Sequence, residues 1–140
     1  MRARRVVGYI RVSTEKQADH DVSLEAQRAK LEGYAQLYDL DLVDVMIDAG
    51  VSAKTLDRPG LQQALGMLRK GQATTLLVTK LDRLTRSVKD LSILLERYFA
   101  KRYALMSVTD QVDTSPAAGR LVVHVLMSVA QWEREAIGER

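Results

Sequence analysis

Arginine and serine follow directly on two runs of apolar residues, where a packed strand would ordinarily end. The first run, residues 6–12, contains Arg11 and leads into Ser13. The second run, residues 74–78, is followed by four charged side chains: Lys80, Asp82, Arg83 and Arg86. Alternation along an extended strand puts Tyr9, Arg11 and Ser13 on one face. Because a guanidinium is costly to bury without a partner, Arg11 indicates a polar site at the end of its strand.

A serine among guanidinium groups favours phosphate chemistry over acyl transfer. A serine that attacks a carbonyl works with a histidine, and neither His20 nor His124 follows a predicted strand. A phosphodiester carries negative charge on its non-bridging oxygens, and its transition state is stabilised by positioned cations. Arginine forks bind phosphate bidentately and would also favour ionisation of Ser13. Attack by Ser13 would leave a phosphoserine ester without requiring a metal, with Asp82 orienting an arginine or handling a proton.

The remainder of the chain alternates short apolar runs with segments of helical periodicity. We expect strands at residues 6–12, 42–47, 74–78 and 104–108, and helices at residues 24–38, 59–71 and 87–99. This alternation is typical of a doubly wound α/β fold, with a mainly parallel sheet and helices on both faces. Residues 49–58 contain turn-forming residues and little periodicity, and we interpret them as a mobile arm.

In such a fold, ligands bind beyond the carboxyl ends of the strands. The first and third strands are neighbours, so the arginines that follow them should converge on Ser13. Gln27 lies on the apolar stripe of helix 24–38, where a hydrophobic residue is expected, and Arg58 ends the arm and can fold over the site. The competing interpretation is a solvated loop with an internal pair between Asp82 and an arginine.

The last segment, residues 114–140, is predicted to be a long helix that begins near Ser115-Pro116. It is apolar almost all the way round, so it needs several neighbours. A central core helix and a subunit interface both satisfy this need, and we favour the interface because the helix follows a completed sheet. The expected interface residues are Leu121, Val122, Val125, Leu126, Val129 and Trp132. We therefore expect an α/β domain at residues 1–113 and an oligomerisation helix, continuing in a longer protein, at residues 114–140.

Composition narrows the class of protein. The 140 residues are 46% hydrophobic and 28% charged, which excludes a disordered or fibrous chain. The absence of cysteine excludes disulfides, thiolate metal sites and a cysteine nucleophile. No apolar run approaches the roughly 20 residues of a membrane span, and the start lacks a signal peptide, so we expect a cytoplasmic protein. The net charge of +3 is small, but 14 arginines against 7 lysines hint at phosphate binding.

Several motifs together resemble the catalytic domain of the serine recombinases, the family of resolvases, invertases and serine integrases. They are residues 9–14 (YIRVST), Gln27, Asp57-Arg58-Pro59 and residues 80–86 (KLDRLTR). Gly119 and residues 132–140 are similar to the long interface helix of that family. The resemblance covers nearly the whole chain. The arm at residues 51–58 and the helix start at residues 22–25 look more like the large serine integrases than the small resolvases.

The resemblance implies a role for each matching residue. Ser13 would be the nucleophile that joins the 5′ end of cleaved DNA and frees a 3′ hydroxyl. Arg11, Arg83 and Arg86 would bind the scissile phosphate. The supporting residues would be Asp82, Gln27, Arg58 and Tyr9, and Lys80 and Arg134 would contact DNA.

The resemblance also implies partners. Members of the family act on double-stranded DNA at specific recombination sites, as homodimers that pair into a synaptic tetramer. They need neither metal nor another cofactor, no membrane is involved, and the expected location is cytoplasmic, in association with the nucleoid. Family members carry a DNA-recognition region after the interface helix. Residues 1–140 contain none, so this fragment by itself should bind DNA weakly.

Three other interpretations remain open. The chain could be a small resolvase or invertase of the same family. It could be a metal-dependent phosphotransfer or phospho-acceptor domain, because Asp48, Asp82 and Asp110 each follow a predicted strand and could hold magnesium. It could also be a non-catalytic assembly module, with residues 114–140 as its functional part.

Overall fold

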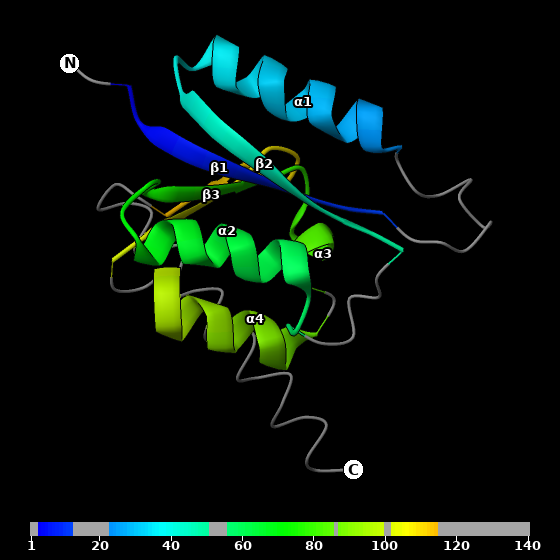
Figure 1. Ribbon diagram of the computed structural model, residues 1–140, viewed down its shortest axis with the longest axis vertical. Coiled ribbons are helices and arrows are strands. Elements are labelled where there is room, and N and C mark those ends of the chain that lie inside the picture. Colours follow the sequence, from blue (N-terminus) through cyan, green and yellow to red (C-terminus); the bar gives the residue numbers. More distant parts are fainter. Residues whose placement is uncertain (1–2, 13–22, 51–55, 86, 100–101, 115–140) are drawn as a thin grey trace.

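The fold is a five-stranded sheet with helices on both faces (Figure 1), seen in a computed structural model that describes residues 3–12, 23–50, 56–85, 87–99 and 102–114. The strands are β1 (Arg5–Val12), β2 (Asp41–Ala49), β3 (Thr75–Val78), β4 (Ala104–Ser107) and β5 (Val112–Asp113). Their order across the sheet is β2-β1-β3-β4-β5, and only β5 is antiparallel to its neighbour. The chain reverses its winding direction between β1 and β3, where doubly wound folds bind ligands.

Each helical layer covers one face of this sheet. The helices are α1 (Leu24–Leu37), α2 (Pro59–Arg69), α3 (Leu81–Leu84), α4 (Val88–Leu94) and a π-helical segment, η2 (Leu95–Phe99). In Figure 1, α1 lies on one side of the sheet, and α2 and α4 lie on the other. Val6 and Ile10 pack with Leu31 of α1, whereas Val7 and Tyr9 pack with Leu61 of α2. The alternation along β1 is therefore as predicted.

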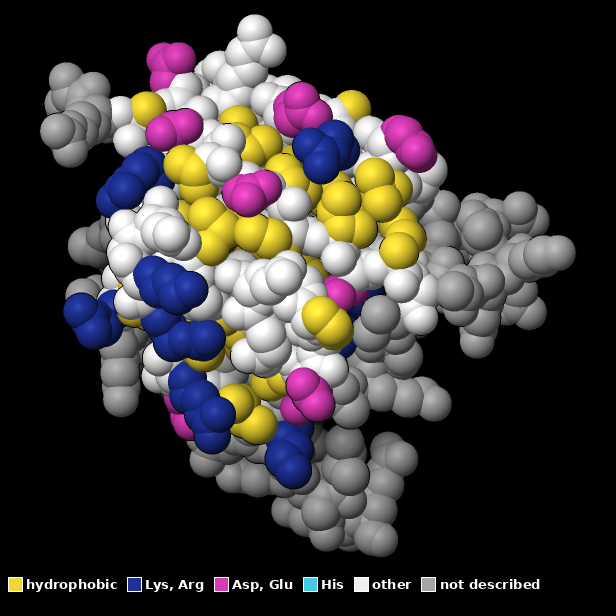
Figure 2. Space-filling view, viewed as in Figure 1, with side chains coloured by type: hydrophobic (Ala, Val, Ile, Leu, Met, Phe, Trp, Pro, Cys, Tyr) yellow, Lys and Arg dark blue, Asp and Glu magenta, His cyan; other side chains and the backbone are white. Residues whose placement is uncertain are grey.

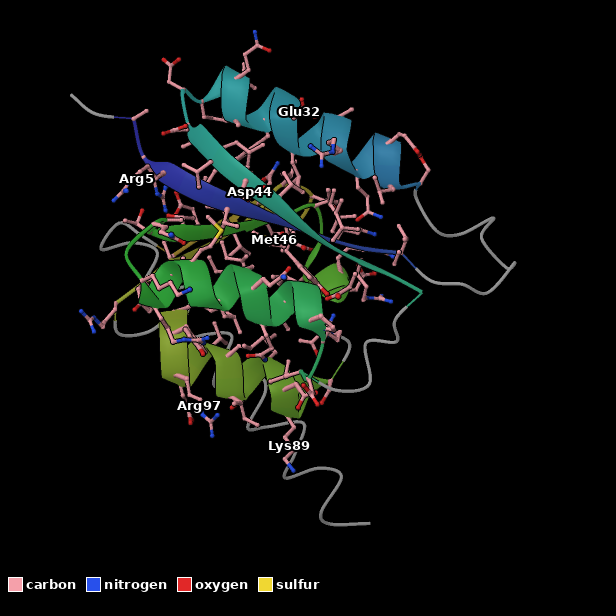
Figure 3. The ribbon with its side chains drawn as sticks, viewed as in Figure 1. Arg5, Glu32, Asp44, Met46, Lys89 and Arg97 are labelled. Carbon is pink, nitrogen blue, oxygen red and sulfur yellow. The ribbon has the colours of Figure 1, made fainter. Side chains whose placement is uncertain are left out.

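Hydrophobic and charged side chains are distributed as this layering requires. Met46 of β2 points toward α2, whereas Arg5, Glu32 and Arg97 point outward (Figure 3). Figure 2 shows hydrophobic side chains over α1 and β2, and Lys and Arg side chains along the α2 and α4 side. Among the described residues, no helix has the length and hydrophobicity needed to cross a bilayer.

Local sequence signals explain where the helices begin and end. The Ser23 hydroxyl accepts a hydrogen bond from the Ala26 N–H, and the Ser87 hydroxyl accepts one from the Asp90 N–H. Both are N-cap bonds, which satisfy donors that a helix leaves free. Pro59 stands at the first turn of α2, and Gly71 follows the helix with φ +75°, a conformation suited to glycine.

The structure corrects several of the predicted boundaries. Ala49 belongs to β2, and Arg58 is buried, so the proposed mobile arm is wrong at both of its described ends. The one-turn helix α3 and the two-residue strand β5 were not predicted, because neither is long enough to show periodicity. Thr114, the first residue of the predicted helix at residues 114–140, is described and is not helical. The other residues of that helix, with its interface residues and Arg134, lie outside the described residues, as do Ser13 and Arg86.

Helix α2 starts very close to the end of β2. The Asp48 carboxylate accepts hydrogen bonds from the backbone N–H groups of Gly60 (2.8 Å) and Leu61 (3.0 Å). A Cβ atom on Gly60 would lie 2.8 Å from the Ile47 carbonyl oxygen and 2.9 Å from the Asp48 carboxyl carbon. Glycine is therefore required here by space, and Asp48 caps α2 from the neighbouring strand.

We expect Gly60→Ala to lower the free energy of unfolding by about 1–3 kcal/mol, because the added methyl group must displace backbone. Gly33→Ala is the matched control. Gly33 lies on the exposed side of α1 with no atom within 4 Å of its would-be Cβ. The free energy of unfolding of the control should rise by up to about 1 kcal/mol, because alanine has a better helix propensity than glycine. Urea denaturation of both variants measures the difference, and equal effects would contradict the close approach.

Candidate active site

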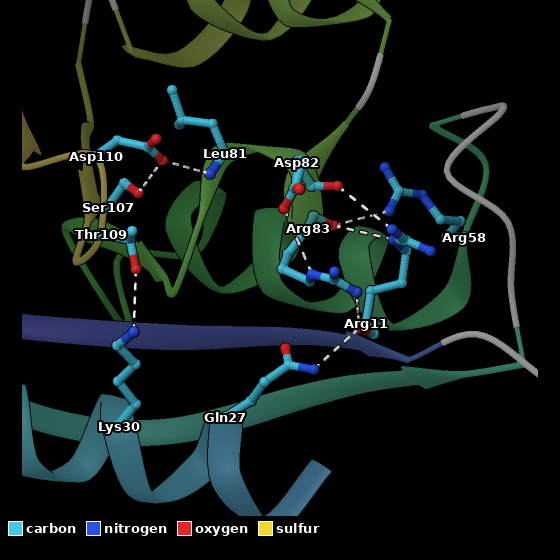
Figure 4. A network of polar contacts seen from close by, with 10 residues as sticks. All are labelled: Arg11, Gln27, Lys30, Arg58, Leu81, Asp82, Arg83, Ser107, Thr109 and Asp110. Atoms are coloured by element: carbon cyan, nitrogen blue, oxygen red, sulfur yellow. Dashed lines mark hydrogen bonds and ion pairs between the residues drawn. The ribbon is translucent and has the colours of Figure 1, made fainter. Parts of the chain in front are cut away.

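Three arginines from three different elements meet at the carboxyl end of β1. Arg11 comes from β1, Arg58 immediately precedes α2, and Arg83 belongs to α3 (Figure 4). Their exposed fractions are 3%, 0% and 5%. Arginine is almost never this buried unless it is paired, so each guanidinium must be satisfied by oxygen atoms of the protein. The arginines at the ends of the first and third strands are predicted to converge, and the structure shows this for Arg11 and Arg83.

The carbonyl groups at the end of α3 supply many of these oxygens. Arg11 donates from Nε to the Arg83 carbonyl and from Nη2 to the Asp82 carbonyl, both at 3.3 Å. Arg58 donates to the Arg83 carbonyl at 3.4 Å and to the Leu84 carbonyl. The last carbonyls of a helix have no partner within the helix and carry partial negative charge. They are therefore suited to offset the cost of burying these cations.

The carbonyl of Arg11 completes the cluster from the other side. Gln27 of α1 donates to it from Nε2 at 3.3 Å, and Arg83 donates to it from Nη1 at 3.4 Å. Gln27 has an exposed fraction of only 1%. The polar residue on the apolar stripe of α1 thus faces the end of β1.

A buried chain of hydrogen bonds joins Arg58 to the start of α2. Arg58 donates from Nη1 to the Tyr9 hydroxyl at 3.0 Å, and that hydroxyl donates to Asp48 Oδ2 at 2.8 Å. Burial raises the pKa of Tyr9 above its ordinary value, and the hydrogen bond to Asp48 raises it further, against the opposing effect of Arg58. Tyr9 therefore stays neutral and can accept from the cation while it donates to the carboxylate.

Asp82 contributes a carboxylate that pairs with one of the three guanidinium groups. Its Oδ1 lies 3.4 Å from Arg83 Nε, and its side chain is 43% exposed. The predicted pair between Asp82 and an arginine is present, yet Arg83 is buried, so the segment is not a solvated loop. Lys80 is exposed just before α3.

The structure brings together six of the eight residues predicted for catalysis, namely Tyr9, Arg11, Gln27, Arg58, Asp82 and Arg83. Ser13 and Arg86 lie outside the described residues. Sequence reasoning missed the structural role of Asp48, although its place directly after a strand was visible.

The three aspartates considered as metal ligands have separate partners. Asp48 binds Tyr9 and the start of α2, and Asp110 accepts from the Leu81 N–H and the Ser107 hydroxyl. In the part of the chain that the structure describes, no three His, Cys, Asp or Glu side chains group as metal ligands would. The arrangement therefore favours the binding of an anion by the arginines over the coordination of a metal ion by Asp48, Asp82 and Asp110.

Residues 6–140 match the protein family described as "Resolvase, N terminal domain". The chain is 40% identical over 134 residues to the DNA-invertase hin of Salmonella typhimurium strain LT2, covering 96% of this chain and 63% of that protein. It is 38% identical to the serine recombinase gin of Escherichia phage Mu, with coverages of 96% and 63%. The chain thus spans less than two thirds of the length of these relatives.

Two solved structures have a similar fold. The crystal structure of the N-terminal catalytic domain of TP901-1 integrase is similar with a TM-score of 0.85 and 36% identity, over 95% of this chain and 98% of that one. A resolvase family site-specific recombinase from Streptococcus pneumoniae is similar with a TM-score of 0.76 and 31% identity, over 96% of this chain and 90% of that one.

Removing the Tyr9 hydroxyl should destabilise the protein in a pH-dependent way. We expect Tyr9→Phe to lower the free energy of unfolding by about 1–3 kcal/mol at neutral pH, because Arg58 and Asp48 each lose a buried partner. Above pH 10.0, the ordinary pKa of tyrosine, the unfolded wild type loses the Tyr9 proton while the folded protein keeps it. The contribution of this hydroxyl then falls by about 1.4 kcal/mol per pH unit.

The difference between wild type and Tyr9→Phe should therefore narrow as the pH rises above about 10, which denaturation at a series of alkaline pH values measures. Parallel stability curves for the two proteins would show that the folded protein does not hold the proton of Tyr9.

Proposed function

Because the chain belongs to the family of resolvase N-terminal domains, we propose that it is the catalytic domain of a site-specific DNA recombinase that cuts and rejoins DNA through Ser13. The observation that carries the proposal is the cluster of Arg11, Arg58 and Arg83, buried at the end of the strand that leads into Ser13. These guanidinium groups supply positive charge at the end of β1, directly before Ser13 in the chain.

The proposed step exchanges one phosphate ester for another. The Ser13 oxygen attacks phosphorus, a bond forms between them, and the bond from phosphorus to the 3′ oxygen of DNA breaks. The serine gives up its proton, and the departing 3′ oxygen gains one to become a hydroxyl. The 5′ end stays attached to Ser13 as a phosphoserine ester, which retains the bond energy for rejoining to another 3′ hydroxyl.

Positive charge stabilises this reaction more than a strong base would. Arg11, Arg83 and Arg86 would hold the non-bridging oxygens of the scissile phosphate. Asp82 would orient Arg83, and Tyr9, Gln27 and Arg58 would support the arginines through the contacts described above. No cofactor enters the proposed step.

The partners proposed for the whole protein are double-stranded DNA at specific sites and further copies of this chain. Lys80 and Arg134 would contact DNA, and residues 114–140 would join two subunits into a dimer that pairs into a synaptic tetramer at the nucleoid. We favour a large serine integrase over a small resolvase or invertase for two reasons. The arm at residues 51–58 and the helix start at residues 22–25 look more like those of the large integrases, and the chain is similar to the TP901-1 integrase domain. The length of the encoded protein after residue 140 distinguishes the two.

Ser13→Ala should abolish the covalent protein–DNA species. The encoded protein is incubated with a pool of DNA in EDTA and denatured in detergent, and the DNA that remains attached is recovered. Wild type should retain DNA whose blocked 5′ ends are joined to Ser13. The control, Ser23→Ala, loses the N-cap bond of α1 and about 1 kcal/mol of stability but should retain DNA.

Covalent DNA on Ser13→Ala would disprove the assigned nucleophile. If the wild-type protein forms no covalent protein–DNA species in EDTA but forms it with metal, the metal-dependent phosphotransfer alternative is favoured. A wild type that dimerises but retains no DNA with or without metal would favour the assembly module.

Replacing an apolar residue of the predicted interface helix by a charge should separate the subunits. Leu126→Glu would place an unpaired carboxylate in a buried apolar contact, which is costly, and sedimentation should show a shift toward monomer. Lys89→Glu, a charge change at an exposed position of α4, should sediment like wild type. A Leu126→Glu protein that remains fully dimeric would contradict the proposed interface.

A further inference from the structure

The one-turn helix α3 carries both Asp82 and Arg83 and is held at its two ends by side chains of other elements. At its carboxyl end, Arg11 and Arg58 donate to its carbonyl groups. At its amino end, the Leu81 N–H donates to Asp110 Oδ2 at 2.8 Å. Lys80, which occupies the N-cap position, makes no side-chain cap bond. Asp110 therefore serves as the cap of α3 from outside the helix.

A helix of four residues has no stability of its own, because nucleation costs more than one turn of hydrogen bonds returns. The position of α3 is therefore set by its contacts with the rest of the domain. Leu84 is fully buried in the hydrophobic core, and Arg11 and Arg58 bind the carbonyl groups at the carboxyl end of the helix. At the amino end, the hydrogen bond from the Leu81 N–H to Asp110 holds the first turn.

Asp110 is exposed, and its carboxylate has a second partner at the end of a strand. The Ser107 hydroxyl, on a fully buried residue at the end of β4, donates to the same Oδ2 atom at 2.7 Å. The neighbouring residue Thr109 donates its N–H to the Thr79 carbonyl at 2.9 Å, and its hydroxyl lies 3.1 Å from Lys30 Nζ on α1. The turn after β4 is thus attached to the sheet and to α1, the helix that carries Gln27 (Figure 4).

We propose that Asp110 is a positioning residue for the arginine cluster. Through the Leu81 N–H it fixes α3, and α3 in turn presents Asp82, Arg83 and the carbonyls that orient Arg11 and Arg58. Asp110 touches no reacting atom. The inference rests on the proposed function only for its consequence on DNA cleavage, whereas its structural part stands on the contacts of α3.

Three variants of the encoded protein separate positioning from other roles. Asp110→Ala removes the acceptor of both bonds. Asp110→Asn removes the charge but keeps a carbonyl oxygen that can accept from Leu81 and Ser107. Asp113→Ala is the control, because Asp113 pairs instead with Arg4, which precedes β1, at 3.0 Å.

The rate of covalent DNA attachment is measured in a single turnover at saturating DNA. Asp110→Ala should be slower by roughly tenfold, the effect of a lost cap bond, with little change in the DNA concentration that gives half the maximal rate. Asp110→Asn should recover most of that rate, and Asp113→Ala should cleave like wild type even where its unfolding midpoint falls. Ser107→Ala removes one of the two hydrogen bonds to Asp110, so its rate of DNA attachment should lie between those of wild type and Asp110→Ala.

A second measurement does not depend on cleavage. In NMR spectra of the same proteins, the Leu81 amide should exchange with solvent about tenfold faster in Asp110→Ala, and the Nε–H signals of Arg11 and Arg83 should shift. Asp110→Asn should leave both near wild type. These readouts stay valid if wild type attaches no DNA, an outcome that would defeat the proposed function alone.

The inference fails if Asp110→Ala keeps the wild-type exchange rate at Leu81. It also fails if Asp110→Asn cleaves as slowly as Asp110→Ala, since charge rather than the cap bond would then matter. Equal slowing in Asp113→Ala would assign the effect to global stability.

Discussion

Three buried guanidinium groups within one small region impose the main physical constraint on this fold. Charged groups are stable inside a protein only when oxygen atoms replace the water that they lose. Arg11, Arg58 and Arg83 obtain those oxygens largely from backbone carbonyls, four of which belong to Arg11, Asp82, Arg83 and Leu84. The strand end, the start of α2 and helix α3 are held together because each must supply a donor or an acceptor to the others.

Several of the acceptors described for this cluster are neutral. Asp82 pairs with Arg83, and Asp48 is joined to Arg58 through the Tyr9 hydroxyl. Backbone carbonyls satisfy the guanidinium donors without cancelling their charge. A phosphodiester, which carries a full negative charge, would therefore interact more strongly with this cluster than the carbonyls do, and this difference in charge is what a site for phosphoryl transfer requires.

The same contacts couple the site to the stability of the domain. Asp48 caps α2 and accepts from Tyr9, so one carboxylate stabilises a helix start and orients an arginine. Asp110 links β4 and α3 in a similar manner. Tyr9, Arg58 and α3 are therefore held by contacts at strand ends and helix starts, and Ser13 follows directly after β1 in the chain.

The sequence by itself determined the α/β class, the approximate places of the long elements and the meeting of Arg11 with Arg83. Alternation, helical periodicity and caps such as Ser23 and Ser87 are local signals, and in a doubly wound fold the first and third strands are neighbours. Only the tertiary structure decided which oxygens the arginines bind, that Asp48 joins Tyr9 to α2, and that Asp110 caps α3. Arg11 and its acceptor on Arg83 are 72 residues apart, and partners so distant are set by how packed segments meet, which no local pattern encodes.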